Sequence, residues 1–273
     1  MTELMDKYAV MGNPVAHSKS PRIHTLFAAQ SSQELEYTAI LVEPGNFANA
    51  VADFQSQGGT GLNITVPFKR EAWALAGKRS DRAQRAGAVN TLVLSESGNH
   101  FGDNTDGAGL VRDLTVNHGT ALAGKRLLLV GAGGAARGVI EPLLNEKPDL
   151  LVIANRTPDK AVALARSFCD LGHTEGCGLD TPEGQGFDII INATAASLSG
   201  DVPALPASVV TTESCCYDMM YADQPTAFMI WADGLGAHRV MDGLGMLVEQ
   251  AAESFYLWRG VRPDTAAVIS ELR

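Results

Sequence analysis

Short apolar runs alternate with helix-spaced apolar positions along the chain, and the clearest example begins near residue 125. The run Leu127–Val130 suits a buried strand and ends at a glycine-rich turn over residues 131–138. Apolar residues then continue at helical spacing, Pro148 closes the segment, and Leu150–Ala154 forms a second apolar run. This order of strand, glycine turn, helix and strand predicts a βαβ unit with a right-handed crossover.

The same rhythm extends in both directions and predicts two α/β lobes. Downstream, a helix over 159–168 precedes short strands at 189–191 and 215–217. Upstream, strands are expected at 8–11, 37–42, 62–66 and 89–94, separated by helical patterns near 21–30, 46–56 and 70–86. A helix after Asp106 is expected to pass between the lobes. A long helix over 244–258 and a short last helix to Leu272 follow at the carboxyl end.

Composition and charge exclude several classes of protein. The chain has 273 residues, about two domains' worth, with 31 acidic and 21 basic residues and a formal net charge of −10. Such a charge repels nucleic acid and anionic membrane surfaces. No apolar run approaches the roughly 20 residues that span a bilayer, and no secretion signal is visible. The four cysteines lack both zinc-site spacing and a disulfide pattern. We therefore expect a soluble cytoplasmic protein without a nucleic-acid or membrane partner.

The glycine-rich turn is a candidate dinucleotide site. Gly131, Gly133 and Ala136 fill the positions that make the turn, admit a pyrophosphate and keep the helix close to the strand. About 20 residues later, where NAD enzymes carry an acid, the sequence has Asn155-Arg156-Thr157 and then Lys160. Arginine, lysine and threonine suit a 2′-phosphate, so this segment favours NADP over NAD. A purely structural glycine turn followed by solvated basic residues is the alternative.

Polar residues at strand ends in the amino-terminal half suggest a second site. Ser18 and Ser20 precede an expected helix, with Ser20 followed by Pro21 as a cap, and together they are a candidate anion site. Asn63 and Thr65 share one face of the expected strand 62–66, and Lys69 follows just beyond its end. The alternatives are a serine that only caps a helix and a lysine that is only solvated.

The motifs taken together resemble those of the shikimate dehydrogenases. The segments, in chain order, are GNPVAHSKSPRIH, NITVPFKR, GAVNT, GDNTDG, GAGGAARG, NRT, INAT, YDMMY and DGLGMLVEQAA. They run from about residue 7 to residue 270, so the resemblance covers nearly the whole chain. It implies a substrate-binding domain over 1–105, a Rossmann-like NADP-binding domain over 106–242, and carboxyl-terminal helices, 243–273, that return to the first lobe. The implied reaction is NADPH-dependent reduction of 3-dehydroshikimate to shikimate, a step towards chorismate and the aromatic amino acids.

The resemblance also implies roles for individual residues. Lys69 and Asp106 would form the catalytic acid-base pair. The substrate carboxylate would be held by Ser18, Ser20 and Tyr221, and its hydroxyl groups by Asn63, Thr65, Asn90, Asp106 and Gln250. The cofactor would contact Asp81, Gly131, Ala132, Gly133, Gly134, Ala135, Asn155, Arg156, Thr157, Lys160, Thr194, Met219, Gly243 and Met246. No metal is implied, and the six histidines are interpreted as structural.

Two alternatives remain open at this point. A relative that oxidises quinate or shikimate with NAD would be expected to carry an acid after the second strand of the cofactor domain, where this chain has Arg156 and Thr157. A catalytically silent sensor on the same fold would be expected to lack Lys69 or Asp106, and both are present. The chain is expected to be a monomer or a homodimer.

Overall fold

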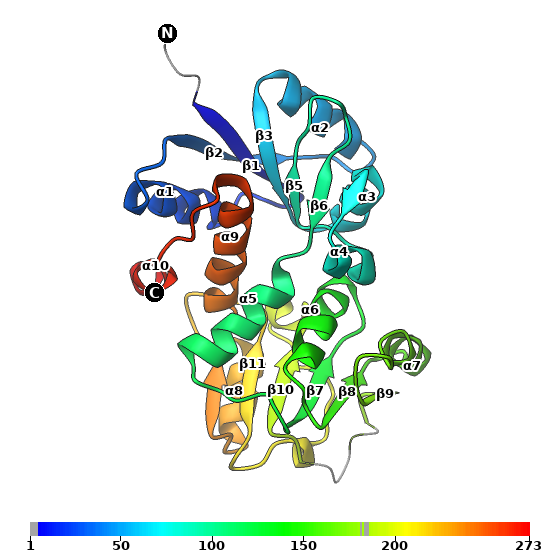
Figure 1. The fold of residues 1–273 in the computed structure, drawn as a ribbon. Helices are drawn as coiled ribbons and strands as arrows, with labels where there is room; N and C mark the ends of the chain where they lie inside the picture. Colours follow the sequence, from blue (N-terminus) through cyan, green and yellow to red (C-terminus); the bar gives the residue numbers. More distant parts are fainter. Residues whose placement is uncertain (1–4, 181, 183–185) are drawn as a thin grey trace. The chain divides into compact units, whose positions relative to one another are not determined.

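The computed structural model describes residues 5–180, 182 and 186–273 and divides the chain into two compact units (Figure 1). The first unit contains the chain up to Gly109 and again from Val248 to Arg273, and the second unit is Leu110–Leu247. The chain passes between the units inside two helices, α5 (Asp106–Arg112) and α9 (Leu244–Arg259). Each unit has its own sheet flanked by helices, which confirms the predicted α/β class with two lobes.

The sheet of the first unit is mixed and has the strand order β2-β1-β3-β5-β6-β4. Its parallel half pairs β1 with β2 and β3, whereas β5 runs antiparallel to both β3 and β6. The strands are β1 (Asp6–Gly12), β2 (Leu35–Leu41), β3 (Gly59–Ile64), β4 (Lys78–Arg79), β5 (Thr91–Val93) and β6 (Phe101–Asp103).

Successive side chains of β1 point to opposite faces of this sheet, and they are apolar on both faces. Helices therefore cover both faces. Ala9 and Met11 pack with Phe47 of α2 in one cluster, while Tyr8 and Val10 belong to another cluster that includes Trp258 of α9. The helices of the unit besides α5 and α9 are α1 (Ser20–Gln30), α2 (Phe47–Ser56), α3 (Lys69–Leu75), α4 (Asp81–Ala86) and α10 (Thr265–Leu272).

The carboxyl-terminal part of α9 is fixed to the first sheet through Trp258. Its indole Nε1 donates to the Leu92 carbonyl at 3.0 Å, and an added Cβ at Gly61 would lie 2.5 Å from the same indole nitrogen. The glycine in β3 therefore makes room for the tryptophan. This packing places the helix that carries Gln250 against the strands that carry the other polar residues of the unit.

The sheet of the second unit is entirely parallel, with the order β12-β11-β10-β7-β8-β9. Figure 1 shows β11, β10, β7 and β8 side by side in this order, with the colour changing from yellow-orange at β11 to green at β7 and β8. The strands are β7 (Arg126–Val130), β8 (Leu150–Ala154), β9 (Thr174–Cys177), β10 (Ile189–Asn192), β11 (Cys215–Asp218) and β12 (Arg239–Met241). The helices are α6 (Gly134–Asn145), α7 (Pro158–Arg166) and α8 (Ala227–Gly234), with a π-helical turn over Asp113–Asn117 and short 3-10 turns over Ala196–Ser199 and Ala207–Val209.

Both faces of the parallel sheet are buried, as the unbroken apolar runs predict. Leu127 and Leu129 of β7 pack in one cluster with helix α6, and Leu128 and Val130 pack in a second cluster on the opposite face. Cys216 is fully buried in that second cluster. Within the described residues, no helix combines the length and hydrophobicity that crossing a membrane requires.

Several local expectations were wrong. The pattern at 70–86 is not one helix but α3, the short strand β4 and α4, because the chain turns extended at Ala76 and approaches Asn99 at Gly77, where an added Cβ would lie 2.0 Å from the Asn99 side-chain oxygen. The strand expected at 62–66 ends at Ile64, so Thr65 lies beyond it. Ser20 is the first residue of α1 and not its cap, which is Lys19.

Candidate active site

Lys69 and Asp106 form an ion pair within the first unit. The Lys69 Nζ lies 2.5 Å from Asp106 Oδ2, with the lysine side chain 22% and the aspartate side chain 9% exposed. Lys69 begins α3 and Asp106 begins α5, so two helix starts bring the two residues together. Both ends of the pair are partly shielded, which strengthens their attraction relative to a surface pair.

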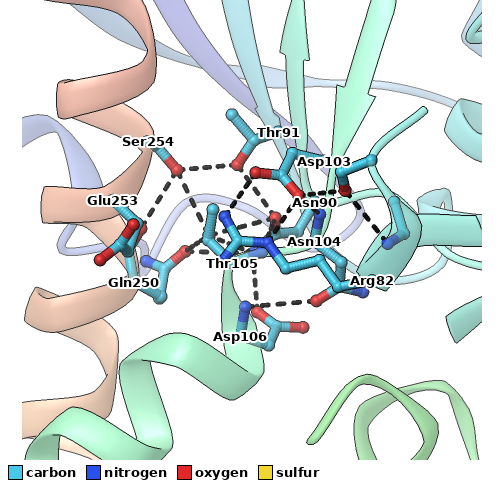
Figure 2. Close-up of polar contacts among 12 residues, drawn as sticks. Arg82, Asn90, Thr91, Asp103, Asn104, Thr105, Asp106, Gln250, Glu253 and Ser254 are labelled. Atoms are coloured by element: carbon cyan, nitrogen blue, oxygen red, sulfur yellow. Dashed lines mark hydrogen bonds and ion pairs between the residues drawn. The ribbon is translucent and has the colours of Figure 1, made fainter. Parts of the chain in front are cut away.

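Asn90 joins Asp106 to α9. Its Nδ2 lies 2.8 Å from Asp106 Oδ1 and 3.3 Å from Gln250 Oε1, while its Oδ1 accepts from the Thr105 N–H at 2.9 Å (Figure 2). Asn90, Thr105 and Gln250 are all buried. The carboxylate of Asp106 is therefore held on one oxygen by an ammonium and on the other by an amide. Both oxygens have a fixed orientation.

A second buried layer contains Asn63. Its Oδ1 accepts from the Tyr37 hydroxyl at 2.7 Å, and its Nδ2 lies 2.9 Å from Ser254 Oγ and 3.2 Å from Thr91 Oγ1. Thr91 and Ser254 lie 2.7 Å apart and connect this layer to Asn90, because Thr91 also donates to Asn90 Oδ1. Burial raises the pKa of Tyr37 well above its ordinary value, although its contact with the Ser20 hydroxyl opposes the shift. Tyr37 is thus a neutral donor.

The other residues expected at the substrate are placed as follows. The Ser20 N–H lies 3.3 Å from Ser18 Oγ, and Ser20 is buried whereas Ser18 is half-buried. Thr65 is half-buried, and its methyl group would lie 2.3 Å from a Cβ added at Gly12, so that glycine admits it. Tyr221 belongs to the second unit, after β11, and is half-buried. By contrast, hydrogen bonds and one ion pair, passing through Thr91, connect five of the expected residues in one network: Lys69, Asp106, Asn90, Gln250 and Asn63.

The glycine turn of the second unit follows β7 and includes a residue in a backbone conformation that favours glycine. Gly131 has a φ of +115°, and an added Cβ would lie 3.3 Å from both the Ala193 carbonyl and the Thr194 methyl group. No atom lies within 4 Å of a Cβ added at Gly133 or Gly134, and Gly133, the residue before α6, supplies no side-chain cap. The Cβ side of both glycines is therefore open, and a glycine turn of this kind before a helix is compatible with a dinucleotide.

The segment after β8 presents the basic residues. Arg156, Thr157 and Lys160 are exposed, at and just after the turn into α7, while the Asn155 Nδ2 donates to the Thr157 carbonyl at 2.9 Å. The turn is thus shaped by Asn155. Its exposed guanidinium, ammonium and hydroxyl groups are suited to a phosphate.

A buried carboxylate organises the loops after β10 and β11. Asp218 accepts from Ser197, Thr226 and Asn192 side chains, and Asn192 Oδ1 in turn accepts from the Thr194 hydroxyl at 2.7 Å. Asp218 and Asn192 are fully buried. Asn192 therefore orients the Thr194 side chain, and Asp218 in turn holds Asn192.

Met219, Gly243 and Met246 lie near one another in this unit. An added Cβ at Gly243 would lie 2.3 Å from the Met219 carbonyl oxygen, so only glycine permits this approach. Met219 and Met246 share the cluster that covers one face of the sheet and are almost fully buried. Asp81, expected at the cofactor, begins α4 in the first unit and is exposed. Among the described residues, no three His, Cys, Asp or Glu side chains gather in a way that could hold a metal ion.

Comparison with known proteins identifies the family. Residues 10–92 match the model of the shikimate dehydrogenase substrate binding domain, residues 113–199 that of shikimate / quinate 5-dehydrogenase, and residues 243–273 that of the shikimate 5′-dehydrogenase C-terminal domain. A protein named shikimate dehydrogenase (NADP(+)) from Nitrosococcus oceani is 56% identical over 98% of this chain and 95% of its own length. The chain belongs to the shikimate dehydrogenase family.

Solved structures agree with the family. An Ael1 enzyme from Pseudomonas putida is 50% identical, with a TM-score of 0.92 over 98% of both chains. Shikimate 5-dehydrogenase from Thermus thermophilus, solved with NADP(H) and shikimate, is 33% identical with a TM-score of 0.86 over 97% of this chain and 98% of that one. The resemblance drawn from the motifs is therefore confirmed.

The sequence did not point to several buried residues whose hydrogen bonds hold the candidate site residues in place. Tyr37 and Ser254 hold Asn63, and Asp218 holds the Thr194 loop. One signal for Ser254 was available, because it follows Gln250 by four positions and so shares its helix face. No local signal marks Tyr37, since its partner Asn63 is 26 positions away on β3, which β1 separates from β2.

Proposed function

We propose that this member of the shikimate dehydrogenase family reduces 3-dehydroshikimate reversibly to shikimate with NADPH, and that Lys69 and Asp106 form its acid-base pair. The observation that carries the catalytic assignment is the 2.5 Å contact between Lys69 Nζ and Asp106 Oδ2, held in place by Asn90. The activity is supported by the name shikimate dehydrogenase (NADP(+)) on a relative that is 56% identical.

The chemistry accounts for the two residue types. NADPH, when bound, supplies the hydride for the ketone carbon. Negative charge then develops on the carbonyl oxygen, and the Lys69 ammonium stabilises that oxygen and donates a proton to it. In the oxidation direction the neutral amine accepts the proton from the hydroxyl group. Asp106 orients the lysine through Oδ2 and contacts the reacting hydroxyl, while Asn90 keeps the carboxylate from rotating.

The substrate residues divide by chemistry. Ser18 and Ser20, which lie together at the start of α1, are proposed to bind the substrate carboxylate, with Tyr221 as a further donor. The substrate hydroxyl groups are assigned to Asn63, Thr65, Asn90, Asp106 and Gln250. These amide, hydroxyl and carboxylate groups can each donate or accept, which suits a polyhydroxylated ring.

Most of the residues proposed to bind the cofactor follow the carboxyl ends of parallel strands of the second unit, where open α/β sheets bind their ligands, whereas Asp81 begins α4 of the first unit. Gly131, Ala132, Gly133, Gly134 and Ala135 are proposed to hold the pyrophosphate on the first turn of α6. The adenosine 2′-phosphate is assigned to Asn155, Arg156, Thr157 and Lys160, and the ribose and nicotinamide to Thr194, Met219, Gly243 and Met246, with Asp81 near the nicotinamide. The open space at Gly133 and Gly134 supports this assignment.

The domain roles follow from these assignments. Residues 1–105 are proposed to bind substrate, residues 106–242 to bind NADP, and residues 243–273 to return to the substrate domain. We further propose a cytoplasmic enzyme that works as a monomer or a homodimer.

A spectrophotometric assay tests the function. The purified chain is mixed with shikimate and either NADP⁺ or NAD⁺, and kcat/KM is measured for each cofactor from the absorbance of the reduced form. Oxidation of shikimate with a clear preference for NADP⁺ is expected. Equal or better use of NAD⁺, or faster oxidation of quinate, would favour the NAD-type relative, and the absence of any turnover would favour a silent sensor.

A further inference from the structure

Asp103, three residues before Asp106, carries a buried carboxylate with several donors. Its Oδ1 accepts from Arg82 Nε at 2.7 Å, and its Oδ2 accepts from Arg82 Nη2 at 2.5 Å (Figure 2). The same Oδ1 also accepts from the Ser80 hydroxyl at 2.5 Å and from the Asn104 N–H at 2.7 Å. The Asp103 side chain is only 6% exposed, and that of Arg82 is 30% exposed. The arginine therefore binds the carboxylate in a bidentate manner, which fixes both the distance and the relative orientation of the two side chains.

These contacts join α4 to the loop that leads from β6 into α5. Arg82 and Ser80 belong to the start of α4, and the Ser80 hydroxyl also caps that helix by accepting from the Ala83 N–H at 3.2 Å. On the loop, Asn104 Oδ1 accepts from the Asp106 N–H at 3.2 Å. The chain of contacts thus runs from Arg82 through Asp103 and Asn104 to the backbone of Asp106.

Stability alone does not explain the pair. Replacing a buried ion pair by apolar groups is often neutral or stabilising, because the desolvation of both charges offsets their attraction. Burial by itself would raise the pKa of Asp103, but the hydrogen bonds and charge of Arg82, together with those from Ser80 and the Asn104 N–H, outweigh it and hold the pKa below its ordinary value. The carboxylate therefore stays charged, and its geometry stays fixed, at neutral pH.

We propose that the Arg82–Asp103 ion pair is a positioning device that sets the backbone of residues 103–106 and thereby aims the Asp106 carboxylate at Lys69. The inference rests on the proposed function in assigning catalysis to Asp106, and it adds two residues that contact neither substrate nor cofactor in that assignment. Asp106 is bound at three points, by Lys69, by Asn90 and through its own N–H. Loss of the third point lets the carboxylate turn away from the lysine while the other residues of the network remain.

The test compares Arg82→Ala and Asp103→Asn with wild type, using Arg22→Ala as the matched control. Arg22 forms an ion pair with Glu271 in the same unit, but their side chains are 60% and 50% exposed and the pair lies outside the network of Asp106. Three measurements are made on the whole chain. They are kcat with the KM values for shikimate and NADP⁺, hydrogen exchange of the backbone amides at 103–106, and the recovery of activity on adding guanidinium chloride at low, non-denaturing concentration.

In Arg82→Ala, kcat is expected to fall by about 10²-fold, the loss that a displacement of about 1 Å produces, with the KM for NADP⁺ within about twofold of wild type. The amides of 103–106 should exchange faster. Guanidinium should restore part of kcat in Arg82→Ala, because it can refill the partly exposed site beside Asp103, but not in Arg82→Ala/Asp103→Asn. Arg22→Ala should match wild type throughout.

Two results would overturn the proposal: wild-type exchange at 103–106 in Arg82→Ala, or a kcat equal to that of Arg22→Ala. If Arg82→Ala does not fold, Asp103→Asn carries the same comparison, since it keeps the shape of the side chain while it removes the charge and replaces one acceptor oxygen by an NH₂ donor. An inactive wild-type chain would count against the proposed function alone, because the exchange measurement decides the positioning role without any substrate.

Discussion

His24 makes the free energy of unfolding of the first unit depend on pH between about 3 and 6.5. It lies in α1 with no exposed surface, and neither ring nitrogen makes a hydrogen bond of ordinary geometry within the described residues. Its ring stacks on Tyr37 at a centroid distance of 4.2 Å, with Phe27 edge-on at 5.8 Å. Burial lowers the pKa of His24 from 6.5 to about 3, with the side chain of Asn63 opposing part of the shift.

The sign and size of the effect follow from proton linkage. Below pH 6.5 the unfolded chain protonates this histidine while the folded chain does not, so the contribution of His24 is present above pH 6.5 and lost as the pH falls towards 3. Each pH unit in that window costs about 1.4 kcal/mol of unfolding free energy. The loss is therefore about 2 kcal/mol at pH 5 and about 5 kcal/mol at pH 3, a large share of an ordinary folding free energy of about 5–15 kcal/mol.

His24→Phe removes the titrating group and keeps an aromatic ring between Tyr37 and Phe27. At pH 7 its free energy of unfolding should lie within about 1–3 kcal/mol of wild type, because the added volume strains the packing while no hydrogen bond is lost. From pH 7 to pH 5 the variant should gain about 2 kcal/mol relative to wild type. Urea unfolding followed by tryptophan fluorescence at several pH values measures this difference.

The control is His17→Phe, which changes an exposed histidine of the same unit and should follow the wild-type pH dependence. Parallel stability curves for wild type and His24→Phe between pH 7 and pH 5 would refute the reasoning. They would mean that the buried imidazole takes up its proton in the folded state as easily as in the unfolded chain.

Three further predictions concern the site and the thiols. Lys69→Ala should lower kcat by about 10²–10⁴-fold with little change in KM, and a large rise in KM with kcat intact would make Lys69 a binding residue instead. Arg156→Gln should weaken binding of NADP⁺ by about 10–100-fold and leave that of NAD⁺ nearly unchanged, as measured by titration of each cofactor. Burial raises the pKa of Cys216 to about 12, so at pH 8 a thiol reagent should modify the exposed Cys169 and leave Cys216 intact until the chain unfolds.

The central strands of the second unit and its helices α6 and α7 could be predicted in detail, because each is marked by a pattern of neighbouring residues in the sequence. Each strand of a parallel sheet buried on both faces is an apolar run, and the run at 150–154 coincides with β8. The edge strands β9 and β12 were missed, since each is short and only partly buried. Helix α8 also went unrecognised: its exposed Ile230 and buried Phe228 give no clear period in eight residues.

The first unit was harder to predict where the chain reverses at short intervals. The break between α3 and α4 depends on Gly77 meeting Asn99, which are 22 positions apart, and β4 exists only because it pairs with β6. Helix and strand propensities calculated over about ten residues contain no information about such distant partners. The motif residues Lys69, Asn90 and Asp106 were nevertheless assigned to one site from the family pattern, and the structure brings them into contact.

The sequence by itself determined the α/β class, the glycine turn, the basic segment after β8 and the family, since all of these depend on residue types at fixed local spacing. Only the tertiary structure decided which polar groups meet. It brought Lys69 to 2.5 Å from Asp106 and placed Asn90 and Gln250 around that carboxylate. It also brought Arg82 to Asp103, and Tyr37 and Ser254 to Asn63. Hydrogen bonds require ångström-scale distances between residues that can lie far apart in the chain, such as Asn63 and Ser254 at 191 positions, and packing of the whole unit fixes those distances.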